Sequence, residues 1–325
     1  MTVARSTRRA SGVSGPEPAT LSDIPALNRV FSDAFTERYR KDGMSGVRVP
    51  QLNPTIWRYA MDDSGADTLV WRNDTGDIVA FNIAHLSGTE GWMGPLAVRP
   101  EWQGAGLGKG IVRAAMDWLR ARPAQVIGLE TMPRTMDNIG FYSALGFIPT
   151  RLTITLTVEA AGVDAAVTLL GRQSSKSTRD DMIAACRALS DAQVRGFDYS
   201  REMQLTGELG LGDTVLLERA GRIRGFAIFH SAPLVEGRAR EELRVLKLVV
   251  ERSEDIGEMS RLLAVTARKT GTRRVAIRVQ GEYTDAYRHL IELGARVRWT
   301  DLRMIAAGYP EPVAATGVVL SNWEI

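Results

Sequence analysis

The chain has 325 residues, of which 44% are hydrophobic and 24% charged, and it contains one cysteine, Cys186. This length allows two compact domains, and a single cysteine excludes an intrachain disulfide and a cysteine-rich metal site. No apolar run reaches the roughly 18 residues of a membrane-spanning helix. A net charge of +3 disfavours nucleic-acid binding, and the lone cysteine agrees with a reducing cytoplasm, where we expect the protein.

The chain begins with a stretch that carries no apolar core pattern. Residues 1–19 are rich in arginine, proline and small side chains, so we expect a flexible tail without a secretory leader. A helix is then predicted from about residue 24, with Ser22 or Asp23 as its N-cap and apolar side chains at helical spacing. The same patterns predict a short helix around 56–61 and strands at 68–71, 78–83 and 92–98.

The strand that ends at Val98 leads through a glycine-rich turn into an amphipathic helix. Residues 103–109 of that turn read Gln-Gly-Ala-Gly-Leu-Gly-Lys. Backbone N–H groups at a helix start have no intrahelical partners, and glycines let a phosphate approach them closely. A P-loop would need Ser or Thr after Lys109, and a dinucleotide fingerprint would need glycine in place of that lysine. The turn therefore predicts a diphosphate site of another kind.

A second motif follows about forty residues downstream. A buried strand is predicted at 125–130, then a helix over 138–147 that ends Phe-Tyr-x-x-x-Gly-Phe, and then an alternating strand at 152–157. Together the two motifs resemble the GCN5-related N-acetyltransferase (GNAT) superfamily, whose signature Gln/Arg-x-x-Gly-x-Gly/Ala is matched at residues 103, 106 and 108. The resemblance implies an α/β fold of mixed, mostly antiparallel twisted sheets flanked by helices.

In the GNAT superfamily the glycine-rich turn holds the pyrophosphate of acetyl-CoA, and the preceding strand pairs with its pantetheine arm. The resemblance therefore implies acetyl-CoA as co-substrate, without a metal, and direct transfer of its acetyl group to a primary amine. It implies these cofactor-binding residues: Leu96, Ala97, Val98, Gln103, Gly104, Ala105, Gly106, Leu107, Gly108, Lys109, Thr135 and Asn138.

Three side chains are candidates for catalysis. By the same resemblance Tyr142 protonates the departing thiolate, although a tyrosine in this pattern is also a packing residue. A base is needed because alkyl amines are protonated at neutral pH, and Glu90 and Glu130 are the candidates, with surface or structural roles as alternatives. The resemblance also implies an acceptor site beside the first helix, which makes Glu37, Arg38, Tyr39 and Asp42 candidates for it, with a solvated surface as the alternative.

The second half of the chain resembles the first. Residues 76–85 and 221–230 share five of ten residues at a constant offset, and strands are expected near 214–218, 222–230, 243–250, 273–279 and 295–305. The segment that aligns with the phosphate turn, 251–258, has four acids, and Tyr142 aligns with Leu290. We therefore expect a tail (1–19), a catalytic domain (20–158), a linker (159–176) and a degenerate domain (177–325) that has lost acetyl-CoA binding.

Two other functions remain open on the sequence alone. The chain could be a non-catalytic acyl-CoA-binding or regulatory protein in which Tyr142 is structural. A nucleic-acid-modifying enzyme would need a clustered basic stripe, which the sequence lacks. The expected partners are acetyl-CoA and an amine of unidentified structure, with no membrane and with a homodimer as an open alternative.

Overall fold

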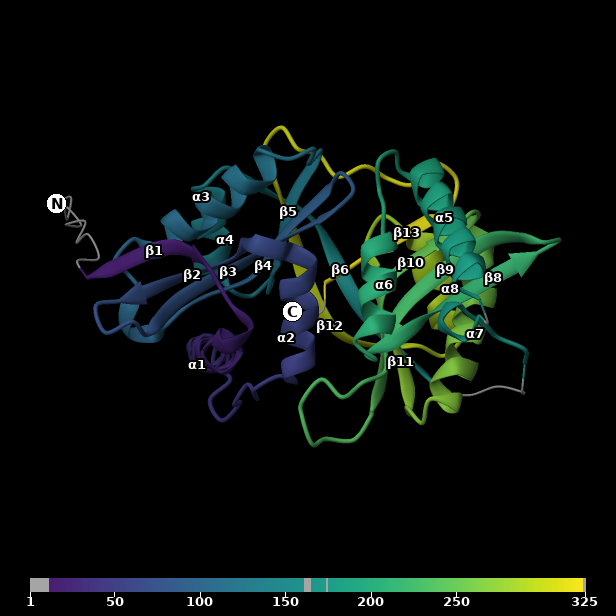
Figure 1. The fold of residues 1–325 in the computed structure, drawn as a ribbon, viewed down its shortest axis with the longest axis horizontal. Coiled ribbons are helices and arrows are strands. Elements are labelled where there is room, and N and C mark those ends of the chain that lie inside the picture. Colours follow the sequence, from purple (N-terminus) through teal and green to yellow (C-terminus); the bar gives the residue numbers. More distant parts are fainter. Residues whose placement is uncertain (1–11, 161–164, 174, 324–325) are drawn as a thin grey trace.

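The computed structural model describes residues 12–160, 165–173 and 175–323. Within these residues one continuous sheet of 13 strands runs through the molecule, and helices cover both of its faces (Figure 1). Among the described residues all strand pairs are antiparallel except β4 with β5 and β10 with β11. The predicted mixed, mostly antiparallel sheet flanked by helices is confirmed.

The first half of the chain forms the left part of Figure 1. Its elements are β1 (Val13–Pro18), α1 (Ile24–Lys41), α2 (Pro54–Ser64), β2 (Thr68–Asn73), β3 (Ile78–Ser87), β4 (Glu90–Val98), α3 (Leu107–Arg120), β5 (Val126–Thr131), α4 (Met136–Ser143) and β6 (Phe147–Glu159). Strand β1 lies in the stretch expected to be a tail, and it pairs antiparallel with β2. Residues 1–11 of that stretch lie outside the described residues.

The second half repeats this order. Its elements are β7 (Thr168–Leu169), α5 (Lys176–Gln193), α6 (Ser200–Glu208), β8 (Gly212–Arg219), β9 (Arg222–His230), β10 (Glu242–Val250), α7 (Ile256–Lys269), β11 (Arg274–Gln280), α8 (Thr284–Glu292), β12 (Arg296–Ala306) and β13 (Val318–Ser321). The segment expected to be a linker contains β7, which pairs with β8. Residues 161–164 and 174 of that segment lie outside the described residues.

The two halves exchange their last long strands. The strand order across the middle of the sheet is β5, β12, β6, β11, so that β12 of the second half lies between two strands of the first. Val297 in β12 pairs with Leu156 in β6, and Leu156 pairs in turn with Ile277 in β11. In Figure 1 the two exchanged strands, teal β6 and yellow β12, run between the halves. A boundary near residue 158 therefore separates the two halves in the sequence but not in space. In the sheet, β12 of the second half lies next to β5, and β6 of the first half lies next to β11.

Two apolar layers hold the first half together. On one face of the sheet, Leu27 and Val30 of α1 and Trp57 of α2 are buried against Phe81 in β3. Helix α1 starts after Asp23, one of the two predicted N-caps, and Pro25 stands in its first turn, where its missing N–H costs nothing. On the other face, the apolar side of α3 is buried against β5. No helix in the described part of the chain is long and apolar enough to cross a membrane.

Candidate acyl-CoA site

The two parallel strands of the first half diverge. Strand β4 pairs with β5 only at their first residues, where Glu90–Trp92 lie opposite Val126–Gly128. Beyond Trp92, β4 continues to Val98 paired with β3 alone, so its edge toward β5 has no strand partner. An amide-containing chain can bind such an edge through main-chain hydrogen bonds, as an added strand would.

A cavity of about 1300 Å³ occupies this gap. Its walls are the end of β4, the glycine-rich turn, the end of β5, the inner face of α4 and parts of α1, with one side chain from β12. The predicted site residues that line it are Leu96, Ala97, Val98, Gln103, Gly104, Ala105, Gly106, Gly108, Lys109, Glu130, Asn138 and Tyr142. Leu107, Thr135 and Glu90 are not among its lining residues.

The glycine-rich turn leaves its backbone open to a ligand. Gly104 and Gly106 have φ of +82° and +84°, which side chains other than glycine rarely adopt, and a Cβ at either position would meet open space. Gly106 is also the N-cap of α3, so the positive end of this helix, where N–H groups lack i−4 partners, lies at the cavity. The Gln103 amide fixes the turn, because its Nε2 donates to the Val98 carbonyl (2.9 Å) and its Oε1 accepts from Lys41 Nζ (3.1 Å).

Tyr142 lies on α4 at the wall of the cavity with 8% of its surface exposed. Its ring contacts Phe141 and Phe147, with centroids 5.1 Å and 6.0 Å apart. Burial raises the pKa of the phenol, so the hydroxyl keeps its proton at neutral pH. The side chain is therefore packed and also available as a proton donor.

Thr135 and Asn138, the two cofactor contacts predicted between β5 and the middle of α4, lie in different environments in the structure. Asn138 lines the cavity, and its Nδ2 donates to Thr131 Oγ1 (3.3 Å). Thr135 is fully buried, and its Oγ1 donates to Asp42 Oδ2 (2.7 Å), which ties this segment to α1. A ligand in the cavity can therefore reach the side chain of Asn138, whereas that of Thr135 is buried away from it.

Glu90 lies between the two halves of the protein and away from the cavity. It is fully buried, and its carboxylate accepts hydrogen bonds from Trp92 Nε1 (2.9 Å), Tyr199 Oη (3.0 Å) and Ser321 Oγ (2.7 Å). Two of these three donors belong to the second half. The geometry gives Glu90 a structural environment at the contact between the halves.

Glu130 lines the cavity but is held by two arginines. Its carboxylate pairs with Arg303 Nε (2.8 Å) and Arg278 Nη2 (2.5 Å) and also accepts from Thr153 Oγ1 (2.5 Å). Burial alone would raise the pKa of Glu130, but the guanidiniums of Arg278 and Arg303 lower it to about 2. A carboxylate with so low a pKa is a weak proton acceptor near neutral pH.

Two acidic residues in the cavity wall, Asp137 and Asp301, were not expected from the sequence. Asp301 comes from β12, and so from the second half of the chain, and it lines the cavity together with Glu130. No local pattern around residue 301 indicates this, because the exchange of β12 into the first half depends on pairing with strands about 150 residues earlier. Of the acceptor candidates on α1, Arg38 lines the cavity and pairs with Asp42 (2.5 Å).

The corresponding gap in the second half is filled by the chain itself. Strands β10 and β11 pair in parallel only at Glu242–Arg244, just as β4 and β5 do at their start. Farther along, Lys247–Val250 of β10 pair with Val318–Ser321 of β13. Strand β13 thus covers the strand edge that stays unpaired in the first half.

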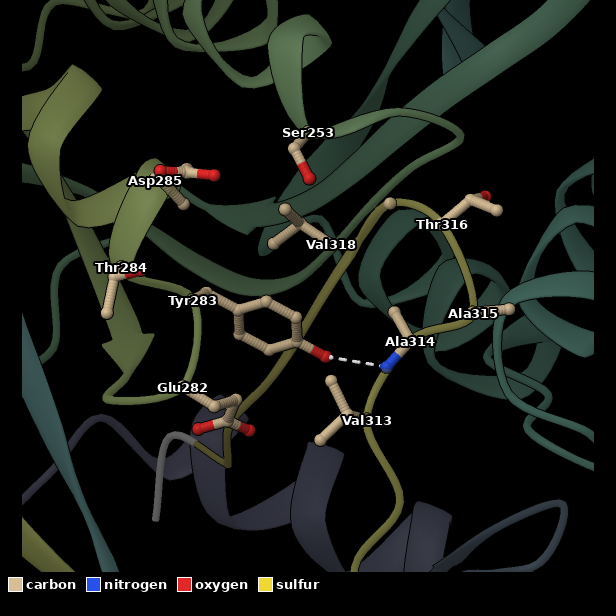
Figure 2. Close-up of a pocket in the computed structure, with 12 residues that line it drawn as sticks. Ser253, Glu282, Tyr283, Thr284, Asp285, Val313, Ala314, Ala315, Thr316 and Val318 are labelled. Carbon is tan, nitrogen blue, oxygen red and sulfur yellow. Dashed lines mark hydrogen bonds between the residues drawn. The ribbon is translucent and has the colours of Figure 1, made fainter.

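What remains beside β13 is a small pocket of about 220 Å³. Figure 2 shows it between Ser253, the start of α8 and the segment that leads into β13, with the hydroxyl of Tyr283 accepting a hydrogen bond from the backbone N–H of Ala314 (3.3 Å). Among the described residues, no group of three or more His, Cys, Asp or Glu is placed to hold a metal ion.

Comparison with known proteins agrees with this geometry. Residues 27–147 match the sequence model of the acetyltransferase (GNAT) family. No curated protein matches the sequence of the chain.

Solved structures match over nearly the whole chain. A GCN5-related N-acetyltransferase from Sphaerobacter thermophilus matches with a TM-score of 0.61 and 13% identity, over 95% of this chain and 99% of that one. A tandem GNAT protein from the clavulanic acid biosynthesis pathway has a TM-score of 0.57 and 13% identity, over 92% and 100%. N-myristoyltransferase from Saccharomyces cerevisiae, solved with bound myristoyl-CoA, has a TM-score of 0.65 and 10% identity, over 95% and 90%. Residues 27–147 thus match the GNAT family in sequence, and nearly the whole chain has the fold of these solved acyltransferases.

Proposed function

We propose that the first half of the chain transfers an acetyl group from acetyl-CoA to a primary amine. The observation that carries this proposal is the single cavity that joins the glycine-rich turn, the unpaired edge of β4 and the hydroxyl of Tyr142. These are an anion site, a strand edge for an amide-containing arm and a proton donor. Acetyl-CoA carries a diphosphate, a pantetheine arm and a thiol leaving group, in the same order.

The reaction that fits this cavity is a direct transfer. The amine attacks the thioester carbonyl while both substrates are bound, the C–N bond forms, the C–S bond breaks, and Tyr142 supplies a proton to the leaving sulfur. Holding both substrates in one cavity contributes to the rate by orientation alone, and no covalent enzyme intermediate is needed. The turn at Gly104–Lys109 holds the diphosphate through backbone N–H groups, the α3 dipole and the Lys109 ammonium.

Calorimetric titration with acetyl-CoA, combined with thiol release in the presence of an amine library, tests the proposal. The variant Gly108→Glu places a carboxylate beside the diphosphate position, where its Cβ also approaches the Phe141 ring to 3.3 Å. The matched control is Gly207→Glu, since Gly207 is exposed on helix α6 and its Cβ would meet open space. Thermal unfolding of both variants checks that they fold.

We expect acetyl-CoA binding in the wild type and in Gly207→Glu, loss of binding in Gly108→Glu, and thiol release with some amines. Binding without thiol release for any amine would favour the alternative of a non-catalytic acyl-CoA-binding protein. Including longer acyl-CoA thioesters in the titration tests the acyl chain, because the inner wall of the cavity contains Met93, Leu129, Met132 and Phe141. Absence of binding by every acyl-CoA would refute the proposal.

A further inference from the structure

A line of alternating charges ends at the cavity. Seven side chains form successive ion pairs in this order: Glu282, Arg151, Glu311, Arg303, Glu130, Arg278 and Asp301. The line contains four carboxylates and three guanidiniums, so 4 − 3 = 1 negative charge has no partner within it. An unmatched charge in a mostly buried network favours either a proton or a bound cation.

The two carboxylates in the interior of this line, Glu311 and Glu130, each pair with two arginines, whereas Asp301 pairs with one. Arg278 Nη2 lies 2.8 Å from Asp301 Oδ2, and the indole Nε1 of Trp299 donates to Oδ1 at 3.2 Å. Asp301 lines the large cavity, while Glu282, the other end of the line, lines the small pocket of Figure 2. The end that meets the proposed thioester site is therefore Asp301.

The groups that face Asp301 leave it able to accept a proton. They are Arg278 on β11, Glu130 on β5 and Tyr39 on α1, and Arg134 lies with its guanidinium 5.2 Å from the Trp299 ring centroid. Burial raises the pKa of Asp301, and the repulsion from Glu130 adds to this, against the opposing effect of Arg278. Its pKa thus moves in the opposite direction from that of Glu130.

Two aromatic rings lie close to Asp301. The rings of Tyr39 on α1 and Trp299 on β12 meet edge to face with centroids 6.3 Å apart. Burial raises the pKa of Tyr39, and the negative charge of Asp301 adds to this, so the phenol and the carboxylate lie within electrostatic reach. An ammonium group binds favourably at such a place, because the carboxylate and the faces of the aromatic rings both attract a cation.

We propose that Asp301, supplied by the second half of the chain, binds the protonated amine of the acceptor and removes one proton before attack. This inference rests on the function proposed above, and it assigns the acceptor to the class of cationic alkyl amines. The ammonium gives one proton to the Asp301 carboxylate and so regains its lone pair. When the tetrahedral adduct collapses, Tyr142 donates its proton to the leaving sulfur, and the second proton of the nitrogen passes to the Tyr142 phenolate and restores it. Asp301 returns its proton to water.

The test compares two kinds of acceptor in wild type, Asp301→Asn and Asp301→Glu. Alkyl amines are protonated at pH 7 and need a base, whereas aromatic amines are neutral there and do not. Asp285→Asn is the matched control, because Asp285 is also paired with an arginine, Arg288 (3.2 Å), but does not line the large cavity. Acetyl-CoA affinity and thermal unfolding are measured for every protein, so that loss of fold is separated from loss of the base.

We expect Asp301→Asn to lower kcat/KM for alkyl amines about 100-fold or more at pH 7, with less than about a threefold effect on aromatic amines and no change in acetyl-CoA affinity. The loss should shrink as pH rises and free alkyl amine forms, and Asp301→Glu should recover part of the rate. In the wild type, kcat/KM for alkyl amines should rise with pH as Asp301 loses its proton, while that for aromatic amines stays flat. This wild-type profile tests the inference even where a variant does not fold.

Three results would overturn the inference. An Asp301→Asn protein as fast as wild type with alkyl amines across the pH range would remove Asp301 as the base and leave the acetyltransferase proposal standing. Transfer to aromatic amines alone would refute the assignment of the acceptor to cationic alkyl amines. A wild-type protein that binds acetyl-CoA but acetylates no amine of either kind would overturn both this inference and the proposed function.

Discussion

Leu302, in the last long strand of the second half, pairs directly with Thr131 at the end of β5 in the first half. This pairing inserts β12 between β5 and β6 and brings Asp301 to the cavity. Each half therefore lacks a strand of its sheet when the other is absent. The exchange makes one folding unit of two segments that are each long enough for a domain.

From this exchange we predict that residues 1–160 produced alone do not form the acetyl-CoA site. Without β12, the strands β5 and β6 lose the partner that lies between them, and backbone groups inside the sheet stay unpaired. Far-UV circular dichroism and acetyl-CoA titration of the isolated segment measure this. Mixing or co-expressing the segments 1–160 and 161–325 should restore both signals. A separate first segment that is folded and binds acetyl-CoA would contradict the prediction.

We predict that Tyr142→Phe lowers kcat about 100-fold while leaving acetyl-CoA affinity unchanged. The phenylalanine ring keeps the contacts with Phe141 and Phe147 but has no proton for the leaving thiolate. Initial rates of thiol release and calorimetric titration give the two quantities. Tyr283→Phe is the control, since Tyr283 is a buried tyrosine at the start of α8 in the second half. Unchanged kcat in Tyr142→Phe would assign this tyrosine to packing alone.

We predict that each chain binds one acetyl-CoA. Strand β13 pairs with β10 where the second half would otherwise present its own open strand edge. Calorimetry should therefore give one site per chain, and the charge reversal Lys109→Glu should weaken the whole binding signal. Arg261→Glu is the control, because Arg261 is exposed on α7, the helix of the second half that takes the place of α3. Two binding sites per chain, or a Lys109→Glu protein that keeps half of the binding signal, would contradict the prediction that β13 prevents acetyl-CoA from binding in the second half.

Glu130 should contribute to stability in a pH-dependent way. Its pKa is about 2 in the folded protein and about 4.5 in the unfolded chain, and a lowered pKa in the folded protein stabilises the fold at pH values above the unfolded pKa. The contribution is full above pH 4.5 and is lost as pH falls toward 2. The difference of pKa corresponds to about 3 kcal/mol, a figure also expected for breaking a buried ion pair.

Urea unfolding of Glu130→Gln across this pH range measures the effect. At pH 7 we expect a free energy of unfolding about 3 kcal/mol below that of wild type, and a difference that shrinks between pH 4.5 and 2. Glu236→Gln, at an exposed position, should match wild type throughout. Equal stability of Glu130→Gln and wild type at pH 7 would show that the ion pairs with Arg278 and Arg303 add nothing to stability.

Local patterns in the sequence determined most of the secondary structure and one part of the site. The helix that follows Asp23, the strand that ends at Val98 and the turn over 103–109 depend on capping, periodicity and glycine, which act within a few residues. For the same reason the internal repeat located the strands of the second half near their observed positions. The assignment of Tyr142, Glu90 and Glu130 to catalysis stays a prediction.

Only the tertiary structure decided which distant side chains meet. Periodicity shows that β12 is a strand but not which strands it pairs with, because register and order depend on packing across the whole sheet. For this reason the sequence could not show that Asp301 enters the cavity wall, that β13 fills the second gap, or that Glu90 is enclosed by Tyr199 and Ser321. The pKa of Glu130 has the same origin, since Arg278 and Arg303 stand about 150 residues or more away in the sequence and only the fold brings their charges to it.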